Sequence, residues 1–301
     1  MIVVGGEALV DLVLAADGSL AAHLGGGPYN TARTIARLGV EVAFLGRVST
    51  DRFGRNVRSS LLSDGVHDDL VVTTEDPTTL ALAELDERGA ASYRFYIEHT
   101  SAPGLTASDA LAKLPDDLYA VHVGTLGLVL EPMASAYQVV IERVAGNALV
   151  MVDVNCRPVL IDDRVGYWSR VREVLRNTDI VKVSDEDLAF LALCAGGHLT
   201  IEDVLAFGPS VVLLTKGADG VDVVTARGAE HVAAPPTKVV DTIGAGDSFG
   251  GGFLSWWHDE RLGRTDLADR DLLRRAATFA ARVAAVTCER AGADPPWRHE
   301  L

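Results

Sequence analysis

The stretch DTIGAGD, from Asp241 to Asp247, places a carboxylate directly after closely spaced glycines, at a predicted turn from strand to helix. Glycines let successive backbone N–H groups converge, and a helix start adds N–H groups that have no partner within the helix. Such a turn binds anions, and Gly244, Ala245 and Gly246 are its predicted donors. Asp247 could accept a proton from a hydroxyl that attacks a phosphoryl group, or serve only as a helix cap. This anion cradle, Gly244–Asp247, therefore favours phosphoryl transfer.

The glycines of the cradle do not form a Walker-type phosphate loop, because no lysine follows them. The first predicted strand also lacks a dinucleotide-binding fingerprint after it, which disfavours a nicotinamide-dependent dehydrogenase. A second glycine cluster, GGGPYN over residues 25–30, precedes a predicted helix. This cluster could form a tight turn that holds Asn30 against a polar ligand. Alternatively, it is an ordinary loop before a core helix.

Polar side chains follow three predicted buried strands at the point where each strand ends. In chain order these side chains belong to Asp153, Asn155, Arg157, Lys182, Ser184, Asp187 and a turn from Thr215 to Gly220. Ligands of parallel α/β sheets bind at the carboxyl edge of the strands. Lys182 and Arg157 could hold phosphate oxygens there, although structural ion pairs would explain such residues equally well.

Apolar runs that read as buried strands alternate with amphipathic segments along most of the chain. The runs begin near residues 1, 42, 119, 148, 179 and 210, and the helical segments cover 29–38, 55–64, 133–144, 166–176 and 267–287. This alternation predicts a doubly wound α/β sheet in a single domain over residues 1–301. A further strand is predicted to end at Val240. The triple glycine 250–252 lies in a predicted helix, where each glycine costs about 1 kcal/mol relative to alanine, so we expect close packing there.

Residues 78–97 break this pattern, because two alternating runs flank an ERGA turn and predict a β-hairpin. We expect the hairpin to project from the core and to be joined by a strand from residues 9–14. The small sheet would then comprise approximately residues 9–16 and 72–100. Since an isolated hairpin is marginal in water, it should lean on the main domain or on a second subunit.

The overall charge limits the classes of partner. The chain has 301 residues and a formal net charge of −15, which disfavours nucleic acid and anionic membranes as partners. No apolar run is long enough to span a membrane, and the first residues do not resemble a secretory signal. The three cysteines are widely separated, and the histidines lack metal-ligand spacing. We therefore expect a cytoplasmic protein with reduced thiols.

The order of these segments resembles the PfkB/ribokinase-like family of sugar kinases over nearly the whole chain. Residues 25–39, GGGPYNTARTIARLG, resemble the family's first signature, and residues 241–253, DTIGAGDSFGGGF, resemble its highly specific second signature. GEALVD, FLGRVSTDRFG, VDVNCRP, VKVSDEDL and LTKGADGV also follow the family's order. The resemblance implies a ribokinase-like three-layer α/β/α sandwich, a small protruding β-sheet lid over the sugar, and ATP as the phosphoryl donor.

The resemblance also implies roles for single residues. Asp247 matches the catalytic base, and Gly244, Ala245 and Gly246 match the anion hole. The positions expected to contact the sugar are Asp11, Gly26, Gly27, Asn30, Tyr93, Phe95 and Arg157. Those expected on the nucleotide side are Lys182, Ser184, Thr215, Gly217 and Gly220. For ions, the resemblance implies Mg²⁺ bound through water near Asp187, where the family has a glutamate, and a monovalent cation such as K⁺ at Asp241.

Among subfamilies the chain looks most like bacterial fructokinases, because GGGPYN is closer to their G-G-A-P-A-N than to the G-G-K-G-A-N of ribokinases. We therefore expect fructose as the acceptor and fructose 6-phosphate as the product. The alternatives are a 2-keto-3-deoxygluconate kinase, a ribokinase or another sugar or nucleoside kinase and, outside the class, a non-catalytic sugar- or nucleotide-binding protein. Tyr29 and Gly27 depart from the family's pattern and leave the acceptor open. The apolar face of the predicted hairpin suggests a homodimer that pairs two lids.

Overall fold

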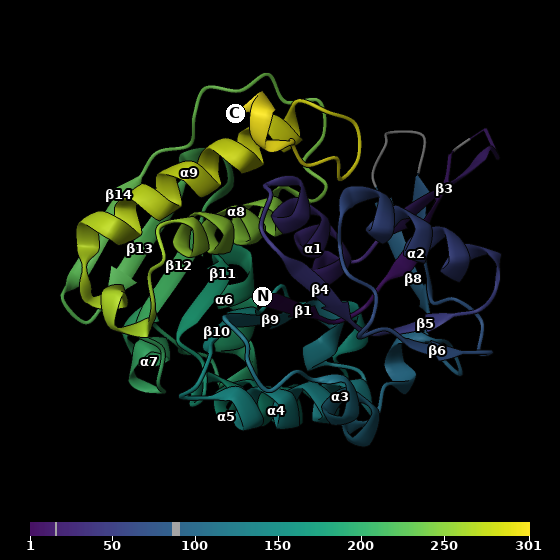
Figure 1. The fold of residues 1–301 in the computed structure, drawn as a ribbon, viewed down its shortest axis with the longest axis horizontal. Coiled ribbons are helices and arrows are strands. Elements are labelled where there is room, and N and C mark those ends of the chain that lie inside the picture. The colour runs from purple at the N-terminus through teal and green to yellow at the C-terminus, as the bar shows by residue number, and fades with distance from the viewer. Residues whose placement is uncertain (16, 86–90) are drawn as a thin grey trace.

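An eight-stranded sheet runs through the computed structural model, which describes residues 1–15, 17–85 and 91–301 (Figure 1). The strand order is β14-β13-β12-β11-β10-β9-β1-β4, with parallel pairs from β12 to β4 and antiparallel pairs at the β13–β14 edge. The strands are β1 (Ile2–Gly5), β4 (Val42–Leu45), β9 (Ala120–Gly124), β10 (Leu149–Asp153), β11 (Ile180–Ser184), β12 (Val211–Thr215), β13 (Val221–Thr225) and β14 (Gly228–Val232). The inner strands are buried on both faces, as continuous apolar runs predict.

Helices cover both faces of this sheet and enclose two hydrophobic cores. One face carries α1 (Gly27–Arg37), α2 (Arg52–Asp64), α8 (Ala245–Asp259) and α9 (Arg270–Cys288). The other carries α3 (Ala107–Lys113), α4 (Met133–Val144), α5 (Arg164–Leu175), α6 (Asp185–Cys194) and α7 (Ile201–Ala206). Of these, α3, α4, α5 and α7 are seen below the sheet in Figure 1. Short 3₁₀ helices are η1 (Ala102–Gly104), η2 (Thr125–Leu128), η3 (Pro158–Leu160), η4 (Gly217–Asp219), η5 (Arg264–Ala268) and η6 (Arg298–Glu300). The predicted three-layer sandwich is confirmed.

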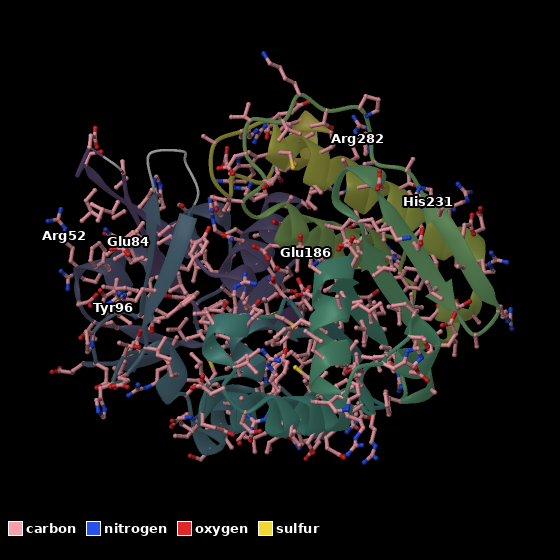
Figure 2. The ribbon with its side chains drawn as sticks, turned by 180° about the vertical axis from the view of Figure 1, so that it is seen from behind. Arg52, Glu84, Tyr96, Glu186, His231 and Arg282 are labelled. Carbon is pink, nitrogen blue, oxygen red and sulfur yellow. The ribbon has the colours of Figure 1, made fainter. Side chains whose placement is uncertain are left out.

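A separate four-stranded sheet has the order β3-β2-β7-β8. Its strands are β2 (Leu9–Leu14), β3 (Leu20–Gly25), β7 (Leu80–Leu85) and β8 (Ala91–Tyr96). The predicted hairpin strands and their pairing with residues 9–14 are confirmed, whereas the predicted ERGA turn and residue 16 lie outside the described residues. β3 is a strand that the sequence interpretation left out, and β6 (Val72–Thr74) pairs with β5 (Arg47–Ser49) instead of joining the hairpin. Figure 2 shows Glu84 and Tyr96 of this small sheet at one end of the molecule, with His231 of β14 at the other.

The prediction of a strand that ends at Val240 is wrong. Residues 233–242, all of which are described, form neither strand nor helix. Two adjacent prolines lack the N–H that a sheet requires. The N–H groups of Val240 and Asp241 instead donate to the Cys288 carbonyl at the end of α9, at 2.8 and 3.2 Å. The run of β-branched residues therefore crosses the surface, where Val240 is 59% exposed.

The triple glycine of α8 lies where this helix packs against two others. A Cβ on Gly251 would lie 2.8 Å from the Cβ of Thr34 on α1, and one on Gly252 would lie 3.1 Å from the Cα of Ala280 on α9. A Cβ on Gly250 would lie 3.6 Å from its nearest neighbours, which is ordinary van der Waals separation. The close packing that we predicted thus holds for two of the three glycines.

The order of the strands also indicates where a ligand could bind. The chain leaves β1 for β4 on one side and later returns to β9 on the other, so the strand order reverses at β1. Crevices for ligands form at the carboxyl ends of strands beside such a reversal. Within the described residues, no helix is long and apolar enough to cross a membrane.

Candidate active site

The anion cradle forms the start of α8, as its glycines predicted. Gly244 caps the helix with a φ of 76°, and no side chain caps the helix in its place. The N–H of Ala245 donates to the Thr242 carbonyl at 3.2 Å. The N–H groups of Gly244, Gly246 and Asp247 have no partner among the described residues. Three backbone donors are therefore free to hold an anion, and Ala245 is not one of them.

Asp247 is buried in the first turn of α8 and faces the start of α1. Its Oδ2 accepts the Nδ2–H of Asn30 at 2.9 Å, and its backbone carbonyl accepts the hydroxyl of Thr31 at 3.3 Å. A Cβ on Gly27 would lie 3.1 Å from Oδ1, so this glycine leaves the second oxygen accessible. Burial raises the pKa of Asp247 to about 6; the Asn30 bond opposes the rise, and the nearby Asp153 carboxylate adds to it. A buried carboxyl with such a pKa suits a general base.

Lys182 lies directly beneath the cradle. Its Nζ donates to Oδ2 of Asp153 at 2.8 Å, and both side chains are almost wholly buried. A Cβ on Gly246 would lie 3.1 Å from Nζ, which places the ammonium against the cradle. Burial opposes the charge, but the contact with Asp153 outweighs it and, with Asp247 nearby, raises the pKa of Lys182. The ion pair with Asp153 therefore favours a charged Lys182 behind the cradle.

The predicted sugar residues of the small sheet share one face. Asp11 lies opposite Ala81, which in turn lies opposite Phe95 on the next strand. Tyr93 lies two residues before Phe95 and opposite Ala83, on the same face. Phe95 packs against the core, whereas Tyr93 is 58% exposed. The sheet thus brings Asp11, Phe95 and Tyr93 to one surface.

The glycine turn before α1 lies against Asp11. A Cβ on Gly25 would lie 2.0 Å from the Oδ2 of Asp11, so glycine leaves room for the carboxylate in its present position beside the turn. Gly26 has a φ of 113°, and a Cβ there would lie 2.5 Å from the carbonyl of Glu7. Burial raises the pKa of Asp11 to about 6, opposed by Arg157 and then by His23. Arg157 therefore lies near enough to Asp11 for its charge to act on that carboxyl group.

Arg157 belongs to the same cluster through the loop after β10. Its Nη1 donates to the Asn155 side-chain oxygen at 2.6 Å, and the Nδ2–H of Asn155 donates to the Thr125 hydroxyl at 3.3 Å. Asn155 and Thr125 have φ values of 35° and 55°, which non-glycine residues rarely adopt. Such strain is concentrated at ligand sites. The structure thus brings Arg157 near the predicted sugar and base residues.

The predicted nucleotide residues reach the same edge of the large sheet. Thr215 ends β12 opposite Ser184, which ends β11 two residues after Lys182. Gly217 and Gly220 have φ values of 55° and 99° in the turn after β12. A Cβ on Gly220 would lie 2.2 Å from a carbonyl oxygen of β14, so this turn requires glycine. Nucleotide contact by these residues stays a prediction.

The predicted ion ligands, Asp187 and Asp241, each hold N–H groups of the protein. Asp187 forms a capping box with Ser184 and also accepts the N–H of Cys156 at 2.7 Å. Asp241 accepts the N–H of Gly292 at 2.8 Å and so ties the loop before α8 to the C-terminal segment. No group of three or more His, Cys, Asp or Glu side chains that could hold a metal occurs within the described parts of the chain. Ion binding by either residue stays a prediction.

Sequence reasoning missed Glu7, Thr125 and His122 and misjudged Tyr29. Tyr29 is fully buried, and its hydroxyl donates to Ser60 on α2 at 2.7 Å, so the side chain points away from the site. Both ring nitrogens of the buried His122 lack a partner among the described residues; burial, followed by Lys182, lowers its pKa to about 3. In the sequence, Glu7 is a charged residue between two apolar runs and lies in the GEALVD segment, which gave it no role of its own.

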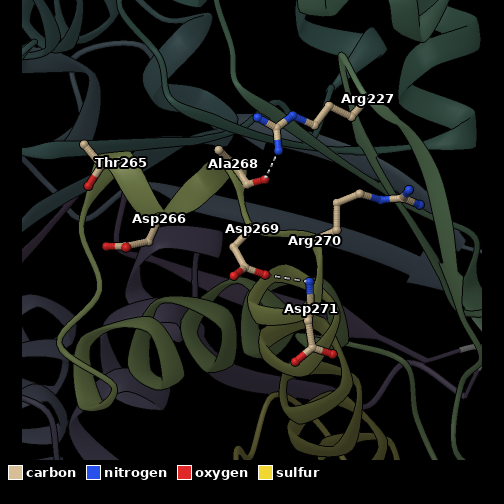
Figure 3. A pocket seen from close by; sticks show the side chains of 7 residues that line it. All are labelled: Arg227, Thr265, Asp266, Ala268, Asp269, Arg270 and Asp271. Atoms are coloured by element: carbon tan, nitrogen blue, oxygen red, sulfur yellow. Dashed lines mark hydrogen bonds between the residues drawn. The ribbon is translucent and has the colours of Figure 1, made fainter.

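A surface hollow of about 490 Å³ lies away from this cluster (Figure 3). It is lined by Arg227, Thr265, Asp266, Ala268, Asp269, Arg270 and Asp271. Two of its polar side chains already have partners: Arg227 donates to the Ala268 carbonyl at 3.2 Å, and Asp269 accepts the N–H of Asp271 at 2.9 Å. Arg264, next to the hollow, pairs with Asp179, which precedes β11. The hollow thus lies at the amino edge of the sheet, opposite the cradle.

Comparison with known proteins covers almost the whole chain. The family model described as pfkB family carbohydrate kinase matches residues 1–300. A fructokinase of Rhizobium leguminosarum bv. trifolii is 33% identical over 259 residues, which are 85% of this chain and 79% of that protein. The crystal structure of a Xylella fastidiosa fructokinase with bound ATP matches with a TM-score of 0.89 and 28% identity, covering 97% of this chain and 93% of that one. An aminoimidazole riboside kinase of Salmonella enterica, complexed with aminoimidazole riboside and an ATP analogue, matches with a TM-score of 0.84 and 27% identity, covering 97% and 94%.

Proposed function

Because the chain belongs to the pfkB family of carbohydrate kinases, we propose that it transfers the γ-phosphate of ATP to a primary hydroxyl of a sugar, with fructose as the acceptor. The observation that carries the proposal is the start of α8, where Asp247 stands beside backbone donors that have no partner among the described residues. A proton acceptor and a set of anion donors at one helix start are the two parts that phosphoryl transfer requires.

In this proposal each group of the cradle has one task. Asp247, held by Asn30 at 2.9 Å, takes the proton of the attacking hydroxyl. The free N–H groups of Gly244 and Gly246 donate to the oxygens of the phosphoryl group as their negative charge develops. Lys182, held by Asp153, adds a fixed positive charge behind them. The small sheet holds the sugar and excludes water, which would otherwise compete as acceptor.

Mg²⁺, when bound with ATP, would neutralise phosphate charge. The acid that the family resemblance assigns to it is Asp187, but protein N–H and hydroxyl groups already bond both of its oxygens. Asp187 would therefore hold the ion only through water, as Mg²⁺ sites commonly do. Asp241 fits a K⁺ site less directly, since its carboxylate already joins two loop segments.

Fructose is favoured over other acceptors by the fructokinase relatives, whose identity to this chain is about 30%. Tyr29 does not bear on the choice of acceptor, because its side chain is buried in the core away from the site. The match to an aminoimidazole riboside kinase keeps a nucleoside-like acceptor as the second candidate. A coupled assay of ADP release should test fructose, ribose, 2-keto-3-deoxygluconate and aminoimidazole riboside at equal concentrations. A kcat/KM for fructose below that of any other acceptor would refute the fructose assignment.

The same assay separates a kinase from a non-catalytic binding protein. We expect ADP release that requires both sugar and ATP and that yields an equal amount of sugar phosphate. Binding of sugar without any turnover would favour the binding protein. A cytoplasmic location also stays a prediction, supported by three free cysteines.

A homodimer that pairs two small sheets is supported by the outer face of this sheet. Leu12, Leu82 and Tyr96 lie on the face opposite Asp11, and Tyr96 and Leu20 are 48% and 61% exposed. Large exposed apolar side chains gathered on one face indicate an interaction surface. Light scattering at micromolar concentration should give twice the chain mass, and a monomer would contradict the dimer.

A further inference from the structure

Glu7 lies in the bend between β1 and β2 with its carboxyl group inside the protein. The residue is 1% exposed, and its Oε1 accepts the N–H of Gly27 at 3.2 Å. Its Oε2 has no hydrogen-bond partner among the described residues. A buried oxygen without a partner destabilises a fold, so packing alone does not explain a glutamate here.

The N–H that Glu7 accepts is the first one of α1, the helix that faces Asp247. A Cβ on Gly27 would lie 3.1 Å from the Oδ1 of Asp247. One turn further along, Asn30 donates to the other oxygen of Asp247 at 2.9 Å. The Glu7 carboxyl group therefore fixes the end of the helix that in turn holds Asp247.

Building on the proposed kinase function, we propose that Glu7 is a positioning residue whose carboxyl group anchors the start of α1, and with it Gly27 and Asn30, against Asp247. β1 ends at the reversal of the strand order, where a ligand crevice forms. An anchor at that point sets the distance between the glycine turn that meets the sugar and the helix start that meets the phosphoryl group.

The charged and titratable groups around Glu7 determine the form in which it works. Burial raises the pKa of Glu7 to about 8; a bond from its own backbone N–H and the charge of Arg157 oppose the rise, and Asp247 adds to it. The buried phenol of Tyr137 is the other titratable group that faces it. With pKa values of about 8 and about 6, Glu7 would be mostly neutral and Asp247 mostly ionised at pH 7. At higher pH, ionised Glu7 would add a second negative charge near that of Asp247.

The pH dependence of sugar phosphorylation tests this role in three forms of the full chain. For wild type we expect kcat/KM to fall above about pH 8, by roughly tenfold per pH unit. Glu7→Gln keeps an acceptor oxygen but cannot ionise, so its kcat/KM should stay level up to about pH 9.5 and lie within about threefold of wild type at pH 7. Glu7→Leu removes the acceptor at similar volume and should lower kcat at pH 7 at least tenfold, with a smaller change in the sugar KM.

Hydrogen exchange at the Gly27 amide supplies a readout that does not depend on activity. The amide should be protected in wild type and in Glu7→Gln, and should exchange at least tenfold faster in Glu7→Leu. A Glu7→Leu variant with wild-type exchange at Gly27 and wild-type kcat would overturn the role of Glu7 as the anchor of α1. A Glu7→Gln variant that keeps the alkaline decline would overturn the neutral carboxyl group as the form in which Glu7 works. If no sugar is phosphorylated by wild type, the kinase proposal fails, and the exchange data still decide whether Glu7 anchors α1.

Discussion

The helices α1 and α8 both begin at a glycine with positive φ and meet at the site. Their first turns differ, because the protein itself accepts the first N–H of α1 and leaves N–H groups of α8 without a partner in the part of the chain that the structure describes. Gly26 and Gly244 have φ values of 113° and 76°, and neither helix has a side-chain cap. In α1 the first N–H is accepted by Glu7, and the next residue is a proline with no N–H. In α8 the N–H groups of Gly246 and Asp247 have no partner within the described chain.

This difference separates a helix start that holds the protein together from one that can hold a ligand. Donors that a buried carboxyl group already occupies cannot bind an anion, whereas free donors at a helix start can. Two glycine clusters of similar appearance in the sequence therefore have different tasks. In the proposed function, the cluster that ends in a carboxylate supplies the reacting groups, and the other cluster positions them.

Asp247→Asn tests the comparison most severely, because it removes the proton acceptor and leaves the N–H groups of α8 in place. We expect kcat for the accepted sugar to fall about 10³-fold, in the range that a general base contributes. The sugar dissociation constant, measured by calorimetry, should change little. Asp271→Asn, in the exposed first turn of α9, is the matched control and should keep full activity. Near-wild-type turnover in Asp247→Asn would remove the base assignment.

Lys182→Met tests whether the cation behind the cradle holds the site together. Removing one partner of a buried ion pair leaves Asp153 uncompensated and should lower the free energy of unfolding by about 3–5 kcal/mol. Lys216→Met removes a lysine whose side chain is 34% exposed, and should cost about 1 kcal/mol or less. Urea unfolding measures both variants. Equal losses in the two would show that burial of the Lys182 pair does not matter.

The stabilities of Gly251→Ala and Gly250→Ala, measured by thermal unfolding, test the packing of two neighbouring glycines of α8. The new methyl group at 251 would meet Thr34 of α1 at 2.8 Å, so we expect a loss of about 1–3 kcal/mol in unfolding free energy. At 250 the nearest atoms are 3.6 Å away, and the higher helix propensity of alanine should offset any contact by up to about 1 kcal/mol. The reverse order of stability would contradict the packing between α1 and α8.

The acid side of the pH–rate profile gives the smallest expected effect. Asp247 must be ionised to accept a proton, so kcat/KM should fall below about pH 6, by roughly tenfold per pH unit. Because the hydrogen bond from Asn30 favours the ionised form, Asn30→Leu should move the midpoint to higher pH. An unchanged midpoint would show that the pKa of Asp247 does not depend on its hydrogen bond with Asn30 of α1.

The sequence by itself determined the large sheet, the strands of the hairpin and the cradle. The continuous apolar runs and the glycine positions are local signals, because backbone sterics and burial on both faces act over a few residues. The pairing of residues 9–14 with the hairpin followed from the same alternation. The two family signatures contain Asn30 and Asp247, so the sequence also predicted that both residues belong to the site.

The tertiary structure alone decided which residues are buried and which groups they bond to. Val240 has the residue types of a strand but lies in a surface loop, because the N–H groups there bond to the end of α9. Tyr29 lies in the core, and Glu7 is buried and accepts the N–H of Gly27. Asn30 and Asp247 are 217 residues apart in the chain and 2.9 Å apart in the fold. Local rules act over one turn or one strand, whereas burial, pKa and hydrogen-bond partners depend on residues that only folding brings together.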